Sequence, residues 1–443
     1  MLAASARLPR PLNARKPVDT DADQVFPGYG QCVFLLVMAV SYHWLLTFAH
    51  TNLHIQPTTT LVGLVELALY LWVIVLVLRA PRSMPSIVLF LFTMATMFVL
   101  AVLREGYLDP KAIRDLLIPF LFFFLASSRR ATDASERRLV SAVFWVVVLG
   151  AVVEVGLAGD YGRVFNTFNY HVAIGTISAE SAHFSGMDVT LNALRPQGIG
   201  TTALNWLVGQ RRISSVFVEP VSLGNYCVVM FAWICAHPWA EVRRLWWMLL
   251  MVAFLMLLSD SRFAMVAVGA LVLIRCLVAP GAMKALAMAS PFVGVALAIG
   301  LAAFHPMHGD NLPGRLTTSG YVFMDFPPQA YFGLHAFAAR FGDMGYAYAL
   351  TRFGLPLVVV LWGVVALRTA RTDRQTRFQS LALIYISMIL SISGSSAFAL
   401  KTAALTWFLI GLGYASSGPA TAAVPPGGAI VAPGRARRGV FQP

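Results

Sequence analysis

The chain has 443 residues, of which 58% are hydrophobic and 12% are charged, about half the charged share of a soluble protein. This composition excludes an ordinary soluble protein, and no polar block is long enough for a separate soluble domain of about 100 residues. The net charge of +13 does not indicate nucleic-acid binding, because Lys and Arg are scattered between apolar stretches. The composition therefore predicts a single all-α, polytopic membrane domain.

A membrane-spanning helix needs about 20 mostly apolar residues. Twelve stretches approach this length: 29–49, 58–78, 85–103, 112–127, 139–158, 217–236, 245–259, 262–279, 284–304, 346–367, 378–395 and 400–417. We expect the membrane domain to cover 29–417, between disordered cytoplasmic tails at 1–28 and 418–443. The first apolar stretch lacks a small-residue cleavage site and is expected to be a signal anchor.

The distribution of positive charge sets the expected orientation. With both termini in the cytoplasm, 21 of the 33 Lys and Arg residues fall on cytoplasmic segments, as the positive-inside rule requires. The other twelve fall on or near the outer face, where Arg outnumbers Lys ten to two. Because the guanidinium group suits bidentate recognition of phosphate, this excess predicts an anionic ligand at the outer surface.

Two outer segments, 159–216 and 305–345, are much longer than ordinary connections, which makes them candidates for function. Aromatic residues in them argue against plain disorder, and two explanations stay open: sugar stacking or an interfacial aromatic belt. The acidic residues Glu66 and Glu154 lie in or near expected spans. They are either isolated carboxylates or groups that couple proton movement to transport.

Three short motifs place charge where expected helices begin at the outer face. They are residues 211–220 (RRISSVFVEP) followed by Gly224, residues 259–262 (SDSR), and residues 342–346 (GDMGY) leading to 352–356 (RFGLP). Helices are expected to begin at Pro220, beside Arg262 and after Asp343, and helix N-termini favour anions. Arg212 and Arg262 are therefore expected to converge on one outer pocket that suits a diphosphate.

Two roles stay open for several of these residues. Arg262 either binds a ligand or forms a structural ion pair with Asp260 or Glu219. Glu219 either acts as a general base or orients Arg212, and Asp343 has the same two possibilities. His335 lies near Arg340 in the second long loop and is a further candidate base.

In their order and placement, the three motifs resemble the signatures of the Wzy-type polysaccharide polymerase and O-antigen ligase superfamily over residues 200–415. Gly342-Asp343 replaces a histidine common in the ligases, which favours a polymerase, and Glu219 with Arg352 suggests the branch of xanthan-like exopolysaccharide polymerases. The resemblance implies about twelve transmembrane helices, two long periplasmic loops and a bacterial inner-membrane location with the active site facing the periplasm.

The resemblance further implies an inverting, metal-independent glycosyltransferase without a cofactor. It would join oligosaccharide repeats from undecaprenyl diphosphate into exopolysaccharide or O-antigen, with a chain-length regulator and a flippase as partners. The expected catalytic residues are Glu219, Asp343 and His335, and the expected diphosphate ligands are Arg212, Arg262, Ser215 and Ser261. Secondary candidates are Arg211, Arg340, Arg352 and Tyr346.

Two other functions stay open. A ligase would transfer finished glycan to a lipid or protein acceptor, so the identity of the acceptor distinguishes it from a polymerase. A transporter of polysaccharide or of lipid-linked sugar would produce flux without a new glycosidic bond, and it would place its charges at the middle of the membrane. Here the charges gather at the outer edge.

Overall fold

The fold comes from a computed structural model that describes residues 26, 28–79, 84–104, 109–129, 131–157, 160–179, 201–307, 309, 311–334, 344–392 and 395–414. The tails expected to be disordered lie almost wholly outside these residues. Every element in the described part of the chain is helical, which confirms the all-α class.

Five long helices form the first part of the chain: α1 (Tyr29–Leu53), α2 (Thr59–Leu78), α3 (Met84–Leu103), α4 (Pro110–Ser127) and α5 (Asp133–Leu157). Side-chain caps set two of the starts. The Thr58 hydroxyl accepts a bond from the amide of Leu61, and the Asp109 carboxylate accepts from the amides of Lys111 and Ala112. Short helices follow in the first long loop: α6 (Tyr161–Val164), α7 (Thr167–Ala173), α9 (Asn205–Val208) and the 3-10 turn η3 (Ser215–Phe217).

The remaining helices belong to the second part of the chain. Its helices are α10 (Pro220–Ala236), α11 (Trp239–Arg244), α12 (Trp246–Ser259), α13 (Arg262–Leu277), α14 (Pro280–Phe304), α15 (Leu312–Met324), α16 (Pro328–Tyr331), α17 (Gly345–Phe353), α18 (Leu355–Leu367), α19 (Asp373–Leu390), α20 (Ser395–Phe398) and α21 (Leu400–Leu412). Helix α10 lies at the centre, packed against α12, α13, α19 and α21, and all of its residues except Val221 are buried.

The helices identify a multi-pass membrane protein, although fewer of them qualify as spans than the sequence predicted. Within the described residues, each of the twelve apolar stretches overlaps a helix, but five helices are long and apolar enough to cross a membrane: α1, α2, the part of α3 from Ser86, α5 and α14. The bent pair α17 and α18 makes a sixth if it is counted as one span. Helices α10, α12 and α21 are apolar but shorter. The expected number of twelve spans stays a prediction.

One expected span, 346–367, is not a single helix. It divides into α17 and α18, which meet at an angle of 110°. Gly354 lies at the break with a φ of 75°, a conformation that glycine adopts without steric cost, and Pro356 follows in the first turn of α18. A Cβ at Gly354 would lie 2.7 Å from the carbonyl oxygen of Phe332, so only glycine fits this corner.

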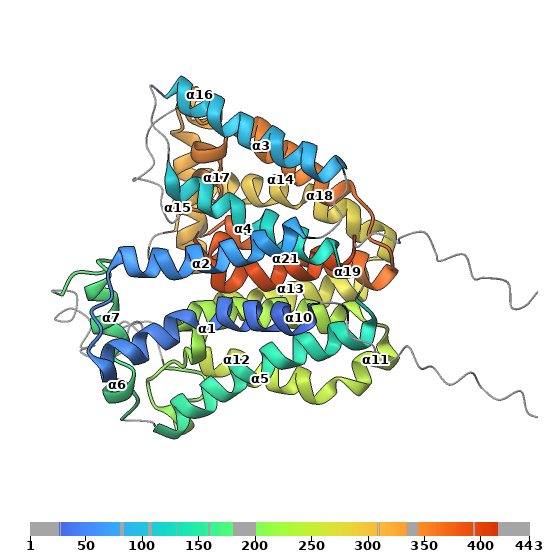
Figure 1. The fold of residues 1–443 in the computed structure, drawn as a ribbon. Coiled ribbons are helices and arrows are strands. Elements are labelled where there is room, and N and C mark those ends of the chain that lie inside the picture. The colour runs from blue at the N-terminus through green and yellow to red at the C-terminus, as the bar shows by residue number, and fades with distance from the viewer. Residues whose placement is uncertain are drawn as a thin grey trace, which may run out of the picture.

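The bundle has two distinct ends (Figure 1). Helices α6, α7, α15 and α16, which belong to the two long loops, lie at one end, called the loop end below. Helix α11 lies at the opposite end, called the α11 end. The predicted long loops therefore share one end of the molecule, and both contain short helices.

Candidate functional site

The start of α10 carries a charged pair that joins two helices at the loop end. Glu219 precedes Pro220 in an extended conformation (φ −137°, ψ 126°), as the sequence predicted for the residue before the first helical proline. Its Oε2 lies 2.6 Å from the Nζ of Lys401, in the first turn of α21, and accepts a bond of 3.0 Å from the Ser222 hydroxyl. Lys401 also lies 3.4 Å from the carbonyl oxygen of Phe217. The cation that the structure places on Glu219 is therefore Lys401, where the sequence favoured Arg212.

This ion pair keeps Glu219 charged. Burial raises the pKa of the carboxyl group, but Lys401, His171 and the bond from Ser222 lower it by more. The resulting pKa of Glu219 is about 2. Because the Lys401 ammonium and the Ser222 hydroxyl both contact its Oε2, the geometry favours an electrostatic or positioning role for Glu219 over proton abstraction.

Arg212 contacts the turn that precedes Arg262, while the predicted convergence of the two guanidinium groups on one pocket stays a prediction. The Nε of Arg212 donates to the carbonyl oxygen of Ser259 over 3.1 Å, and the amide of Ile213 donates to Leu258 over 2.9 Å. Arg262 begins α13 in the same turn, and its side chain is exposed. Arg212 and Ser259, which are 47 positions apart in the chain, are thus in contact at the turn between α12 and α13.

Ser261 and Gly224 fix the position of that turn against α10. Ser261 caps α13, and its hydroxyl accepts from the amide of Ala264. Gly224 faces it across the helix interface, where an added Cβ would lie 2.4 Å from the Cβ of Ser261. The hydroxyl of Ser261 is therefore engaged in holding the helix start, and its role as a diphosphate ligand stays a prediction.

The segment before η3 is held by Glu154 of α5. Its Oε2 accepts bonds from the amides of Ser214 and Ser215 over 2.9 and 2.6 Å, and its Oε1 lies 3.4 Å from the guanidinium of Arg211. Arg211 also lies over the Tyr161 ring at 5.0 Å. Glu154 is thus not isolated. Its carboxylate contacts two backbone amides and a guanidinium group, and these contacts hold the polar loop against α5.

Ser215 has a structural place in this arrangement. It is fully buried, its φ of 52° is unusual for serine, and its hydroxyl donates to the carbonyl oxygen of Val147 over 2.6 Å. Gly150 makes room for it, because a Cβ there would lie 2.8 Å from the Ser215 hydroxyl. The structure therefore gives Ser215 a role in shaping the loop, and nothing in its contacts supports the expected one on a diphosphate.

A buried imidazole lies beside the Glu219 and Lys401 pair. His171 of α7 is 5% exposed, and neither ring nitrogen has a hydrogen-bond partner among the residues that the structure describes. Burial lowers the pKa of His171 to about 4, with Lys401 acting in the same direction and Glu219 opposing it. The ring is therefore neutral at physiological pH.

A second charged group lies next to it along α1 and α4. Tyr42 donates to Glu66 over 2.6 Å, Arg114 lies 3.5 Å from the same carboxylate, and Arg114 also pairs with Asp115 at 2.8 Å. The hydroxyl of Tyr348 donates to Asp115. Glu66 thus has a cation and hydroxyl donors around it, so it is not the isolated carboxylate that the sequence left open.

The secondary candidates on α17 are bonded within the bundle. Arg352 is buried, forms an ion pair with Asp109, and lies over the Tyr348 ring at 4.4 Å. The Tyr346 hydroxyl lies 2.7 Å from the Ser387 hydroxyl. Both side chains hold α17 to its neighbours. The remaining candidates His335, Arg340 and Asp343 lie outside the described residues.

Lys401 and His171 are the residues that the sequence did not single out as site residues. Lys401 had a readable signal, because it is the only charged residue between 378 and 417, and a lone charge beside an apolar span needs a partner. His171 had none, since only the folding of the first long loop buries it. Tyr161, Phe165 and Tyr170 of that loop are also buried, so these three form neither an exposed sugar platform nor a lipid belt, whereas Trp206 is 80% exposed.

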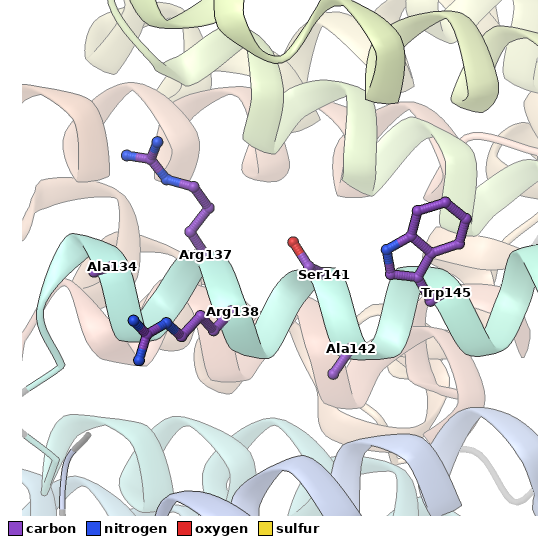
Figure 2. A pocket seen from close by; sticks show the side chains of 6 residues that line it. All are labelled: Ala134, Arg137, Arg138, Ser141, Ala142 and Trp145. Carbon is purple, nitrogen blue, oxygen red and sulfur yellow. The ribbon is translucent and has the colours of Figure 1, made fainter. Parts of the chain in front are cut away.

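The hollow of about 600 Å³ in Figure 2 lies elsewhere, along the outside of α5. Its lining residues are Ala134, Arg137, Arg138, Ser141, Ala142 and Trp145. Arg137 lies 3.4 Å from Glu241 of α11, which places the hollow towards the α11 end. Within the described part of the chain, no group of three or more His, Cys, Asp or Glu side chains has an arrangement that suits a metal ion.

Fold and site together define a multi-pass helical membrane protein in which a cluster of charged and imidazole groups lies where the first long loop meets the bundle. No family model, no curated protein and no solved structure matches the chain.

Proposed function

We propose that this protein is a polysaccharide polymerase of the bacterial inner membrane. It transfers glycan from undecaprenyl diphosphate to a lipid-linked acceptor at the periplasmic face, as an inverting glycosyltransferase that uses no metal. The proposal begins from the resemblance of residues 211–224, 259–262 and 342–356 to the Wzy-type polymerase and O-antigen ligase superfamily. A flippase and a chain-length regulator are the partners that such a reaction requires.

The observation that supports it most is the meeting of Arg212 with the turn that carries Arg262. Two guanidinium groups at one helix start can bind a diphosphate through several charge-assisted bonds, and the free amides of that helix start favour an anion as well. Arg262 is exposed and Arg212 is partly exposed, so a lipid-linked ligand can reach both from outside the bundle.

These residues suit the leaving-group side of the reaction. The acceptor hydroxyl oxygen forms a bond to the anomeric carbon of the donor sugar, and the bond from that carbon to the diphosphate oxygen breaks. The electron pair leaves with undecaprenyl diphosphate, whose developing negative charge Arg212 and Arg262 stabilise. The hydroxyl proton passes to a base on the protein.

The test uses the purified protein in liposomes with undecaprenyl-diphosphate-linked oligosaccharide extracted from the host membrane. Wild-type protein is expected to lengthen the glycan, and Arg212→Ala and Arg262→Ala are each expected to slow transfer by about 100-fold or more. Arg163→Ala is the matched control, because Arg163 is an exposed arginine of the first long loop whose partner is Asp160. Absence of lengthening by wild-type protein, or full activity in both variants, would refute the proposal.

The Glu66, Arg114 and Asp115 group supports a second candidate function, transport of lipid-linked sugar. Carboxylates paired with a cation between spans are typical of coupled transporters. The same liposomes distinguish the two functions. A transporter moves the lipid-linked oligosaccharide between leaflets without lengthening it, and Glu66→Gln then lowers flux while Arg212→Ala does not.

A further inference from the structure

His171 is held in place by a helix that is itself firmly attached to α1. The amide of Asn166, at the start of α7, donates to the Thr51 hydroxyl over 3.0 Å, and the Tyr170 hydroxyl lies 2.8 Å from Nδ1 of His43. Asn52 of α1 donates to the carbonyl oxygen of Val164 over 2.8 Å. These bonds hold the chain just before His171 against α1.

The ring nitrogens are the exception in this well-bonded region. A neutral imidazole offers one donor and one acceptor, and buried polar atoms usually have partners, because leaving one unpaired costs about 1 to 3 kcal/mol. Neither nitrogen of His171 has a partner in the described part of the chain. The acceptor nitrogen can take the hydrogen of a sugar hydroxyl, and the other ring nitrogen can donate to a second oxygen.

Charged and titratable groups from three other segments surround His171. Glu219 faces it from α10, Lys401 from α21 and His43 from α1. The carboxylate and the ammonium of the first two are in contact and nearly cancel, and burial keeps the resting ring neutral. When the ring takes up a proton, Glu219 is the negative group that stabilises the resulting imidazolium.

We propose that His171 is the catalytic base of this protein, which takes the proton from the acceptor sugar hydroxyl as that hydroxyl attacks the lipid-linked donor. The inference rests on the proposed polymerase function. The hydroxyl oxygen bonds to the anomeric carbon, the electron pair of the broken bond leaves with the diphosphate on Arg212 and Arg262, and the proton moves to a ring nitrogen of His171. The imidazolium returns the proton to water after the product leaves. Glu219 and Lys401 act through His171 as positioning residues.

The experiment compares His171→Gln and His171→Ala with His50→Gln, a matched control because His50 lies on α1 towards the loop end, where its Nδ1 lies 3.0 Å from the Ile55 carbonyl oxygen. Two quantities are measured in liposomes: the single-turnover rate of glycan transfer, and the dissociation constant of undecaprenyl diphosphate. His171→Gln is expected to slow transfer by about 100-fold or more while binding changes by less than about twofold. Added imidazole is expected to raise the rate of His171→Ala and to leave His50→Gln unchanged.

Three results would overturn the inference. A wild-type rate of transfer in His171→Gln would show that His171 is not the base. An equal loss of transfer and of undecaprenyl diphosphate binding in that variant would assign His171 a structural role. A His171→Ala rate that imidazole does not raise also counts against the base. If wild-type protein transfers no glycan, the proposed function fails first and this inference fails with it. The failure of His171 alone leaves the Arg212 and Arg262 phenotypes intact.

Discussion

Buried charged residues explain much of how this protein holds its helices together. Burying a single charge is costly, and the cost falls when an opposite charge and further hydrogen bonds accompany it. Three buried acidic side chains each meet a cation from another segment: Glu154 with Arg211, Asp109 with Arg352, and Glu136 with Arg374. Glu219, whose side chain is 30% exposed, meets Lys401 in the same way. Such pairs specify which segments meet more than they add net stability.

The lowered pKa of His171 predicts that the folded protein loses stability at acid pH. The pKa of an ordinary histidine is about 6.5, whereas burial holds the pKa of His171 near 4 in the folded protein. Between these values the unfolded chain binds a proton that the folded chain does not, so stability is complete above pH 6.5 and decreases as the pH falls towards 4. The full shift corresponds to about 3 kcal/mol.

The measurement is the thermal unfolding midpoint of detergent-solubilised protein between pH 4.5 and 6.5. In this window Glu219, with a pKa of about 2, stays charged in the folded state, and an unfolded carboxyl begins to protonate only near the lower limit. The midpoint of wild-type protein is expected to fall with decreasing pH, and that of His171→Gln to fall less. Parallel curves for the two proteins would contradict the assigned pKa shift.

For single residues, the sequence was a better guide to the location of the site than to the ion-pair and hydrogen-bond partner of each side chain. The approach of Arg212 to the turn before Arg262 could be predicted from helix starts and charge alone, whereas the convergence of the two guanidinium groups on one pocket stays a prediction. The partner of Glu219 could not, because Lys401 reaches it from the far end of the chain and no local pattern records that contact. The burial of Ser215 was equally hidden, since it depends on the unusual φ of that residue and on the space left by Gly150.

At the scale of the elements, the contact between α10 and α13 sets the position of the Arg262 turn. Gly224 allows this contact, because any Cβ there would lie 2.4 Å from the Cβ of Ser261, well inside normal contact distance. Gly224→Ala is expected to destabilise the protein by about 1 to 3 kcal/mol through overpacking. It is also expected to weaken binding of undecaprenyl diphosphate by displacing the turn that carries Arg262.

Gly269→Ala is the matched control, because Gly269 is in α13 and nothing lies within 4 Å of its Cβ position. That change is expected to leave binding unaltered and to stabilise the helix by about 0.5 to 1 kcal/mol, the ordinary gain of alanine over glycine. Both quantities are measured, as a detergent-denaturation free energy and as a dissociation constant. Wild-type binding and stability in Gly224→Ala would show that the close contact is not needed.

The helices themselves were largely predictable, since long apolar runs bounded by Pro, Ser and Asp mark their positions. Pro220 and Arg262 begin helices where the sequence placed them. Two features were not predictable from runs of apolar residues. The corner at Gly354 divides one expected span, because an apolar count does not detect a change of direction, and the long loops fold into short helices whose burial depends on α1.

At the scale of the whole molecule, ion pairs fix the identity of the α11 end. The start of α5 binds Arg374 of α19 through Glu136, and it approaches Glu241 of α11 through Arg137. These contacts place the starts of three helices at one end, the end that carries clustered arginines such as Arg243 and Arg244. The positive-inside rule predicts that this end faces the cytoplasm, and we therefore expect the Glu219 and His171 cluster on the outer side.

This orientation can be tested with single cysteines in a Cys276→Ser background, since Cys276 is the exposed native cysteine and Cys32, Cys227 and Cys235 are buried. The probe positions are exposed residues: Asp160 and Gln329 in the two long loops, and Arg243 and Arg371 near the α11 end. A membrane-impermeant maleimide applied to intact spheroplasts is expected to label Asp160→Cys and Gln329→Cys. It is expected to label Arg243→Cys and Arg371→Cys only after the membrane is opened, because the arginine-rich end is retained inside.

The decisive comparison is between Asp160→Cys and Gln329→Cys. The first position follows α5 and the second follows α14. The two therefore share a side of the membrane only if the chain crosses it an even number of times between Asp160 and Gln329, with α14 included in the count. Helices α10, α12, α13 and α14 lie in this interval, and α10, α12 and α13 are each too short or too charged to qualify as a span by length and composition. Labelling of both cysteines from outside therefore means that an odd number of these three helices cross together with α14, whereas labelling from opposite sides would separate the two long loops and remove the shared outer site.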